Sequence, residues 1–299
     1  MLFQGLGVAL VTPFHADGRL DKTALRNLVK HTLPHVDFLV PLGTTGENPV
    51  LSDLESQQVI EIVLEENQGK KPILVGCGGN DTRKVCLRIE QYTKLYPIQG
   101  FLSVTPYYNK PSQAGLILHY NQVAQATQLP IVLYNVPGRT SVNMLPKTVL
   151  EIAHAHHNIV AIKESSGSLE QGMEIFRSKP AHFSVLSGDD PLALPGIALG
   201  FSGLISVVAN VFPAETAQLV RLCQKQSFES ALKIHYSLLP TISLLFQEGN
   251  PTGIKAYLAE KGICGSHTRL PVPPASNQLT KAIQQDIERI QGEFVLLST

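Results

Sequence analysis

The sequence predicts an α/β fold: a closed (β/α)8 TIM barrel followed by a small helical region. Eight short apolar runs follow one another through the first two-thirds of the 299 residues. They are rich in Val, Ile and Leu and show little polar alternation, as expected of parallel strands covered on both faces. Helix-length segments separate them. Eight such units in about 210 residues suit a closed barrel, which has roughly 200 to over 400 residues.

The predicted strands lie at 7–11, 37–41, 72–76, 100–105, 130–135, 159–162, 183–186 and 203–208. A doubly wound sheet is the alternative, but the Gly-x-Gly-x-x-Gly turn that often opens such a sheet is missing from the sequence. After the second strand, Ser52 and Glu55 have the spacing of a capping box and predict a helix over 51–67.

From residue 213 onward the pattern becomes helical, and turn-rich stretches interrupt it at 248–253 and 270–276. We therefore divide the chain into a barrel over 1–225, which carries the predicted site, and a C-terminal helical region over 226–299.

Composition restricts the partners. Lys plus Arg and Asp plus Glu both number 24, so no excess of basic residues is available to neutralise a nucleic-acid backbone. No apolar run has membrane-spanning length, and the first five residues lack the basic region of a signal peptide. The cysteines form no CxxC pair, which favours a reduced cytoplasmic protein in which they are packing residues: Cys77, Cys86, Cys223 and Cys264.

Polar residues follow the predicted strands directly, where a barrel of this kind places its active site. They follow the second, fourth, fifth, sixth and seventh strands at 43–47, 105–111, 134–140, 163–167 and 187–190, and the eighth at 206–210. Taken singly, each motif has a structural alternative. Gly-Thr-Thr-Gly-Glu at 43–47 can cap the next helix or seat an anion on its N–H groups and hydroxyls.

Lys163, at the end of the sixth strand, is the most informative residue. It is either a lysine extending to solvent or a nucleophilic amine, because partial burial disfavours the ammonium form. A neutral amine attacks a ketone to give an imine, which acts as an electron sink without a metal or organic cofactor.

Imine chemistry also needs a proton carrier near the amine. Tyr134, one strand earlier, is suitably placed, and Thr45 and Tyr108 would complete a relay. Taken in isolation, Tyr107 and Tyr108 are more often packing aromatics. Arg139 offers a planar fork to a substrate carboxylate or is a solvated residue of a Pro-Gly turn.

Metal and thiol chemistry are not favoured. His154, His156 and His157 are clustered, but they do not form the i,i+4 pair of a zinc motif. None of the cysteines has a triad-like local signature.

Together, Gly-Thr-Thr-Gly-Glu at 43–47, Tyr-Asn-Val-Pro-Gly-Arg-Thr at 134–140 and Ile-Lys-Glu at 162–164 resemble the dihydrodipicolinate synthase and N-acetylneuraminate lyase family of class I aldolases. The resemblance covers nearly the whole chain. It implies that Lys163 forms a pyruvate imine and that Tyr134, Thr45 and Tyr108 form the proton relay. It also implies that Thr44 and Thr45 hold the pyruvate carboxylate.

The resemblance carries further implications for the assembly and the substrate. Gly188 and the Ile205 carbonyl match positions that line the substrate site. Tyr108 matches a tyrosine that enters from a neighbouring subunit, which implies a homo-oligomer, usually a homotetramer built as a dimer of dimers. Thr45 and Arg139 resemble the synthase branch, which condenses pyruvate with L-aspartate 4-semialdehyde on the diaminopimelate route to lysine; sialic-acid lyases differ at both places.

One departure concerns feedback by lysine. Where many synthases carry a histidine pair and a glutamate that help bind the amino acid, the matching positions here are Asp53, Ser56 and Lys84, although Asn80 and Tyr107 are retained. Lys84 would repel the ammonium of the effector, so we predict weak or absent inhibition.

Three other functions are compatible with parts of this pattern. The nearest is another pyruvate-dependent aldolase of the same family, acting on a sugar acid or hydroxy-oxoglutarate. A barrel that binds phosphorylated sugars is opposed by Asp189 and Asp190 after the seventh strand. A catalytically silent barrel predicts loss of Lys163, Tyr134 or Thr45, and all three are present.

Overall fold

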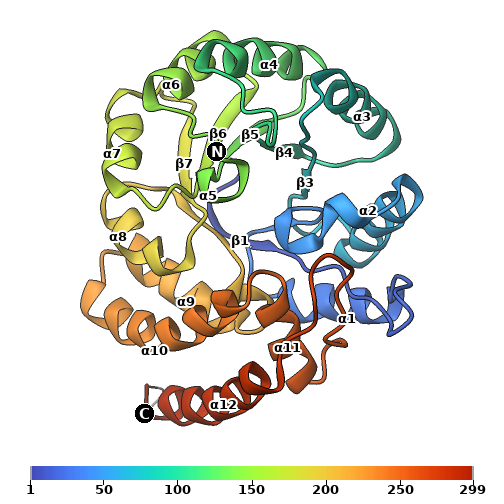
Figure 1. Cartoon of the computed structure of the whole chain (residues 1–299). Coiled ribbons are helices and arrows are strands. Elements are labelled where there is room, and N and C mark those ends of the chain that lie inside the picture. Colours follow the sequence, from blue (N-terminus) through green and yellow to red (C-terminus); the bar gives the residue numbers. More distant parts are fainter. Residues whose placement is uncertain (1, 298–299) are drawn as a thin grey trace.

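Eight parallel strands form the centre of the structure, a computed structural model that describes residues 2–297. Figure 1 shows the strands inside a ring of helices. Their bounds are β1 (Gly5–Ala9), β2 (Phe38–Val40), β3 (Leu74–Gly76), β4 (Gly100–Val104), β5 (Ile131–Asn135), β6 (Ile159–Glu164), β7 (Ser184–Ser187) and β8 (Gly203–Ser206). The predicted barrel is confirmed, with the first strand beginning two residues earlier than expected.

The sheet order is β2-β1-β8-β7-β6-β5-β4-β3, so β2 and β3 lie at its two ends. A single parallel bridge, Leu39 to Ile73, joins these ends and closes the barrel. The backbones approach closely here: a Cβ atom on Gly76 would lie 2.0 Å from the Leu42 carbonyl oxygen. We call this junction between β2 and β3 the seam.

The helices lie between and after the strands. They are α1 (Lys22–Thr32), α2 (Asp53–Asn67), α3 (Thr82–Leu95), α4 (Gln113–Gln125), α5 (Pro137–Thr140), α6 (Pro146–Ala155), α7 (Leu169–Ser178), α8 (Ala193–Ala198), α9 (Pro213–Gln224), α10 (Phe228–Gln247), α11 (Thr252–Glu260) and α12 (Asn277–Leu297). Among the described residues, none of these helices is long and apolar enough to cross a membrane.

Short polar side chains begin several of these helices. The predicted capping box is present in α2, where Ser52 accepts from the Glu55 N–H and the Glu55 carboxylate accepts from the Ser52 N–H. At the starts of α1, α3 and α7, the side chains of Asp21, Asp81 and Ser168 each accept a hydrogen bond from a backbone N–H of the helix. Each cap satisfies an N–H that has no partner within its own helix.

Two hydrophobic clusters hold the barrel together. The inner cluster fills the interior and includes Val40, Leu102, Val132, Leu186 and Ile205. The outer cluster lies between the strands and the helices, and the four cysteines pack in or against it as predicted. The strands are therefore covered on both faces, which explains their continuous apolar sequences.

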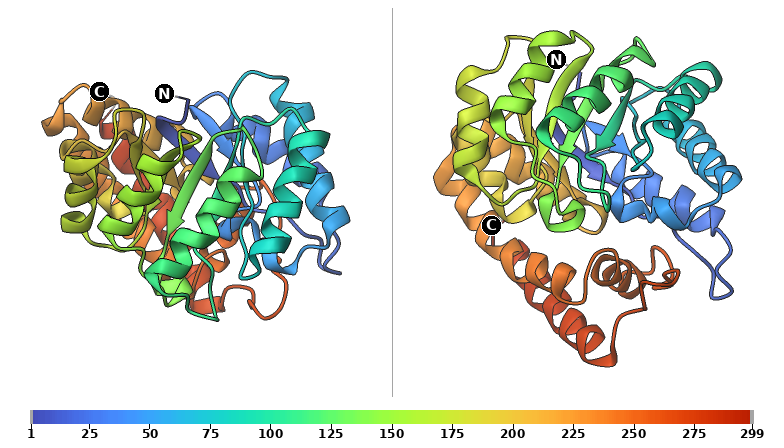
Figure 2. Two further views of the ribbon diagram at one scale, coloured as in Figure 1. Left: turned by 90° about the horizontal axis from the view of Figure 1, so that it is seen from above. Right: turned by 45° about the horizontal axis from the view of Figure 1, so that its top comes forward.

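Helices α10, α11 and α12 pack together on one side of the barrel (Figures 1 and 2). Within this layer, Tyr257 and Thr241 both donate hydrogen bonds to the buried Asp286 carboxylate. The predicted division between residues 225 and 226 falls in the turn between α9 and α10 and stays a prediction.

Candidate active site

Lys163 and Tyr134 lie side by side inside the barrel. They are register partners on β6 and β5, and both side chains are buried. The Lys163 Nζ atom lies 4.3 Å from the centre of the Tyr134 ring. The parallel pairing of the two strands thus brings together the predicted nucleophile and the predicted proton carrier.

Ile205 lies on β8, and Gly188 lies just beyond the end of β7. Gly188 comes directly after β7, and a Cβ atom there would lie 2.6 Å from Lys163 Cε and 1.8 Å from Ser165 Oγ. Any side chain at this position would therefore displace the lysine. Ile205 is fully buried in the inner cluster, where it pairs with Gly7 of β1.

Two carboxyl groups follow β7. Burial raises the pKa of Asp189, while the charge of Lys163 acts in the opposite direction. Asp190 is also buried; it accepts from the Ser206 hydroxyl at 2.5 Å and from the Val207 N–H at 2.9 Å. Because Asp190 occupies the N–H groups after β8, they are not available to a phosphate group.

The neighbour of the lysine, Glu164, fixes the end of β6. Its buried carboxylate accepts from the Asn135 amide, the Ser166 N–H at 2.7 Å and the Gln171 amide at 3.0 Å. Burial raises the pKa of Glu164, and these hydrogen bonds act in the opposite direction. The network holds β5 and β6 together next to Lys163 and Tyr134.

The motif at 43–47 forms a 3-10 turn, η1 (Thr44–Gly46), after β2. Thr44 lines the cavity described below, whereas Thr45 is 2% exposed. The Asn250 side-chain amide donates to Thr45 Oγ1 at 3.0 Å. A residue 205 positions away thus contacts the hydroxyl predicted for the relay.

Glu47, the last residue of the motif, is held by the C-terminal region. Its carboxylate forms a buried ion pair with Lys255, whose side chain is 0% exposed, and accepts from the Arg269 N–H at 3.1 Å. Lys255 also donates to the His267 carbonyl at 2.8 Å. Burial lowers the pKa of Lys255, and the Glu47 carboxylate acts in the opposite direction.

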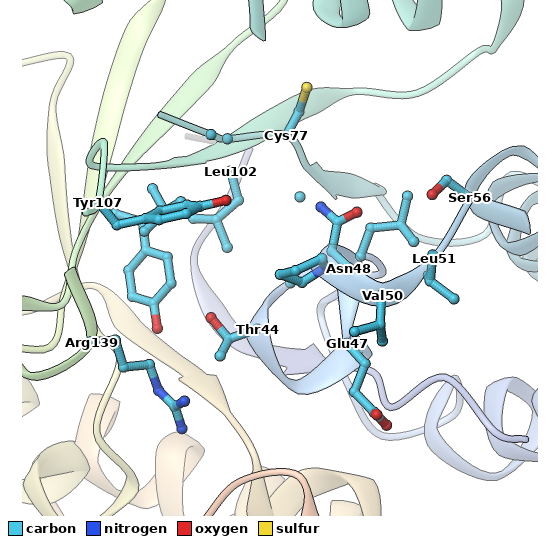
Figure 3. Close-up of a pocket in the computed structure, with 18 of the residues that line it drawn as sticks. Thr44, Glu47, Asn48, Val50, Leu51, Ser56, Cys77, Leu102, Tyr107 and Arg139 are labelled. Carbon is cyan, nitrogen blue, oxygen red and sulfur yellow. The ribbon is translucent and has the colours of Figure 1, made fainter. Parts of the chain in front are cut away.

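A cavity of about 560 Å³ opens beside this motif. Residues of the barrel and of the loops at 250–251 and 269–272 line it together. Figure 3 shows Thr44, Tyr107 and Arg139 toward one end and Val50, Leu51 and Ser56 toward the other. Tyr134 is on its wall, and Lys163 lies next to Tyr134 rather than among the lining residues.

Arg139 lies on α5 at the cavity, where its Nη2 atom is 3.4 Å from the Asn250 carbonyl oxygen. Within the described part of the chain, this long hydrogen bond uses one donor of the Arg139 guanidinium, so most of its N–H groups can bind a ligand. Arg139 is therefore a cavity residue with a planar donor group, as a carboxylate site requires.

Tyr108 is not brought to the other relay residues within residues 2–297. It is 86% exposed, and its backbone φ is 70°, in the left-handed region. Tyr107, in contrast, lines the cavity. Tyr108 is thus not a packing aromatic of its own chain.

The sequence predicts no zinc motif in the histidine cluster at 154, 156 and 157. Of these three residues, His154 alone lies on α6. His156 contacts the Asn121 side chain at 2.7 Å, and the His157 ring lies beside that of His182. Among the described residues, no group of three or more His, Cys, Asp or Glu side chains is placed to hold a metal ion.

The sequence alone does not identify Asn250, Lys255 and Glu164 as functional residues. Asn250 falls in a stretch interpreted only as turn-rich, and its partner Thr45 is 205 residues away. Lys255 is 208 residues from Glu47. In the sequence, Lys255 stands alone inside an otherwise apolar helical segment, and this pattern is the signal that indicates a buried ion pair.

A buried lysine at the end of the sixth strand, with a tyrosine ring against its amine, is the arrangement that a Schiff-base lyase requires. The model of the dihydrodipicolinate synthetase family matches residues 2–290. A 4-hydroxy-tetrahydrodipicolinate synthase of Parabacteroides distasonis is 46% identical over 272 residues, which are 91% of each chain. The chain belongs to the dihydrodipicolinate synthetase family.

Solved structures agree with this assignment. The dihydrodipicolinate synthase of Thermotoga maritima superposes with a TM-score of 0.95 at 38% identity and covers 97% of this chain and 99% of its own. The chloride-inhibited dihydrodipicolinate synthase of Acinetobacter baumannii, complexed with pyruvate, has a TM-score of 0.93 at 35% identity, with 96% and 99% covered.

Proposed function

We propose that the barrel condenses pyruvate with L-aspartate 4-semialdehyde to give 4-hydroxy-tetrahydrodipicolinate, in the diaminopimelate route to lysine. The observation that carries this proposal is the buried Lys163 amine 4.3 Å from the centre of the Tyr134 ring. Family membership and the relatives' activity support the same reaction.

The chemistry starts at Lys163. Its amine adds to the ketone carbon of pyruvate, and loss of water gives an imine. Loss of a methyl proton then gives an enamine, whose carbon attacks the aldehyde and forms the new C–C bond. The aldehyde substrate carries its own amino group, so attack of that group on the imine carbon releases Lys163 and closes the ring.

Tyr134 is the proton carrier in this proposal, because its ring lies against the lysine amine. Thr45 continues the relay, and Thr44 and Thr45 seat the pyruvate carboxylate at the turn after β2. Arg139 binds the carboxylate of the aldehyde, since its planar donor group lines the cavity. Gly188 and Ile205 line the pyruvate end.

The test is borohydride reduction in the presence of pyruvate, followed by intact-mass and peptide mass spectrometry. We expect a pyruvate-sized adduct on Lys163 and none on the Lys163→Ala variant. A folded wild-type protein without the adduct would exclude the imine mechanism and restore the silent barrel. A panel of aldehydes then identifies the second substrate; preference for a sugar-acid aldehyde would favour the alternative aldolase.

Arg139 distinguishes these aldehydes. Replacing Arg139 by Ala should raise the KM for L-aspartate 4-semialdehyde at least tenfold, because a charge-assisted bidentate contact is worth more than about 1.4 kcal/mol. The KM for pyruvate should change much less. Equal changes in both constants would contradict the assignment of Arg139 to the aldehyde.

The proposed working unit is a cytoplasmic homo-oligomer, a dimer of dimers, in which Tyr108 completes the relay of a neighbouring subunit. The Tyr108 side chain is 86% exposed and its backbone is in the left-handed region. These features support the role, because an exposed aromatic ring held away from its own barrel needs a partner surface. Analytical ultracentrifugation gives the oligomeric state.

Subunit mixing tests the role of Tyr108 directly. The Lys163→Ala chain keeps its tyrosine, and the Tyr108→Phe chain keeps its lysine. If Tyr108 acts across subunits, co-refolding the two poorly active variants restores one working site in each mixed pair. If it acts within its own chain, the mixture shows only the average of the two parents.

A further inference from the structure

Asn250 lies between α10 and α11, in the C-terminal region, yet it lines the same cavity as Thr44 and Arg139. It is 9% exposed. Its amide nitrogen donates to Thr45 Oγ1 at 3.0 Å, and its backbone carbonyl accepts from Arg139 at 3.4 Å. One residue therefore contacts both a relay hydroxyl and the group that binds the aldehyde carboxylate in the proposed function.

The direction of the hydrogen bond to Thr45 matters for proton transfer. A hydroxyl carries one proton and two lone pairs. Because the Asn250 amide nitrogen donates, the Thr45 oxygen accepts and its own proton stays free for another acceptor. If the amide carbonyl faced Thr45 instead, that proton would be used on Asn250, and Thr45 would lose its donor.

The surroundings of Asn250 favour the first orientation. Its Oδ1 atom is buried and has no hydrogen-bond partner within the described part of the chain. Turning the amide over would place the NH2 group, with two protons to satisfy, in that position. A buried N–H without a partner is rarer than an under-satisfied carbonyl oxygen, so the amide nitrogen belongs toward Thr45.

Asn250 is also held firmly relative to the motif at 43–47. Lys255, five residues further along, forms the buried ion pair with Glu47, two residues after Thr45. The two segments are thus joined at two points, Asn250 to Thr45 and Lys255 to Glu47. A contact between two such anchored segments keeps its geometry during turnover.

We propose that Asn250 is a positioning residue that fixes the direction of the Thr45 hydrogen bond and thereby keeps the Thr45 proton available to the relay. Through its carbonyl it also orients Arg139. This inference rests on the proposed function, in which Thr45 belongs to the proton relay.

The test compares two substitutions. Asn250→Asp is nearly the same shape, but a carboxylate only accepts, so Thr45 must donate to it. We expect kcat at saturating pyruvate to fall by about 10²-fold, at the lower end of the contribution of a positioned proton carrier. Asn250→Ala removes the donor but leaves the Thr45 proton free, so its kcat should fall less than about tenfold.

A double-mutant cycle with Thr45→Val separates a positioning role from a structural one. If Asn250 acts through Thr45, Asn250→Asp should cause little further loss of kcat in the Thr45→Val background. The same fold-loss in both backgrounds would overturn the proposal, as would a wild-type kcat for Asn250→Asp. Should the aspartate variant not fold, the cycle with Asn250→Ala and Thr45→Val applies the same criterion.

Two controls complete the experiment. Asn277→Asp places the same charge change on an exposed residue at the start of α12 and should leave kcat unchanged. Borohydride trapping of the wild-type protein is done first. A wild-type protein without the Lys163 adduct refutes the proposed function, whereas an adduct combined with independent losses in the cycle refutes only the role of Asn250.

Discussion

Replacing Lys255 by Met should destabilise the protein strongly, because it leaves the Glu47 carboxylate buried without its cation. The Lys255 side chain is 0% exposed, that of Glu47 is 3% exposed, and the two form a direct ion pair. Removing one partner of a buried pair typically costs about 3 to 5 kcal/mol. At roughly 2 cal/mol/K of unfolding entropy per residue, a chain of this length should lose about 5 to 8 °C of melting temperature.

The assay is thermal unfolding followed by circular dichroism at one fixed protein concentration, since oligomerisation makes the melting temperature depend on concentration. The matched control is Glu47→Gln combined with Lys255→Met. This double variant removes the unpaired charge and should recover at least half of the loss. If Lys255→Met melted like the wild-type protein, or if the two substitutions were additive, the reasoning would be wrong.

Two further predictions concern pH and feedback. Burial lowers the pKa of His119 to about 4, below its ordinary 6.5. The neutral imidazole therefore contributes to the free energy of unfolding above pH 6.5, and this contribution is lost as the pH falls toward 4, by about 3 kcal/mol. His119→Gln should flatten the melting temperature over this range, and an unchanged slope would refute the assignment. L-Lysine should inhibit weakly or not at all, because the exposed Lys84 ammonium lines the cavity and the Asp81 carboxylate, 3.9 Å away, only partly offsets its charge. Half-inhibition at submillimolar lysine would contradict this, whereas Lys84→Glu should increase inhibition.

Much of the fold was predictable because it depends on local pattern. The apolar runs identified all eight strands, and Ser52 with Glu55 located the start of α2. The first strand began early because Gly5 and Leu6 pair with β8, and a pairing partner nearly two hundred residues away leaves no local signal.

The candidate site was predictable in part for the same reason. Lys163 and Tyr134 end neighbouring strands, so a parallel sheet had to bring them together. Asn250 and Lys255 follow no strand, and the path of the C-terminal region back to the turn at 43–47 decides their contacts. The role predicted for Tyr108 cannot be explained from one chain, because within residues 2–297 its side chain is exposed and away from the other relay residues.

The seam has a consequence for how the protein responds to heat. Across it, the Leu39 N–H donates to the Pro72 carbonyl at 3.0 Å and the Gly76 N–H to the Pro41 carbonyl at 2.9 Å, whereas β5 and β6 pair over five registered positions. A junction with few backbone hydrogen bonds opens at lower free energy than the rest of a sheet. The turn with Thr44 and Thr45 follows β2 directly, so local opening at the seam would leave the carboxylate seat held chiefly by the contacts of Asn250 with Thr45 and of Lys255 with Glu47. Warming should then reduce turnover some degrees before it melts the barrel.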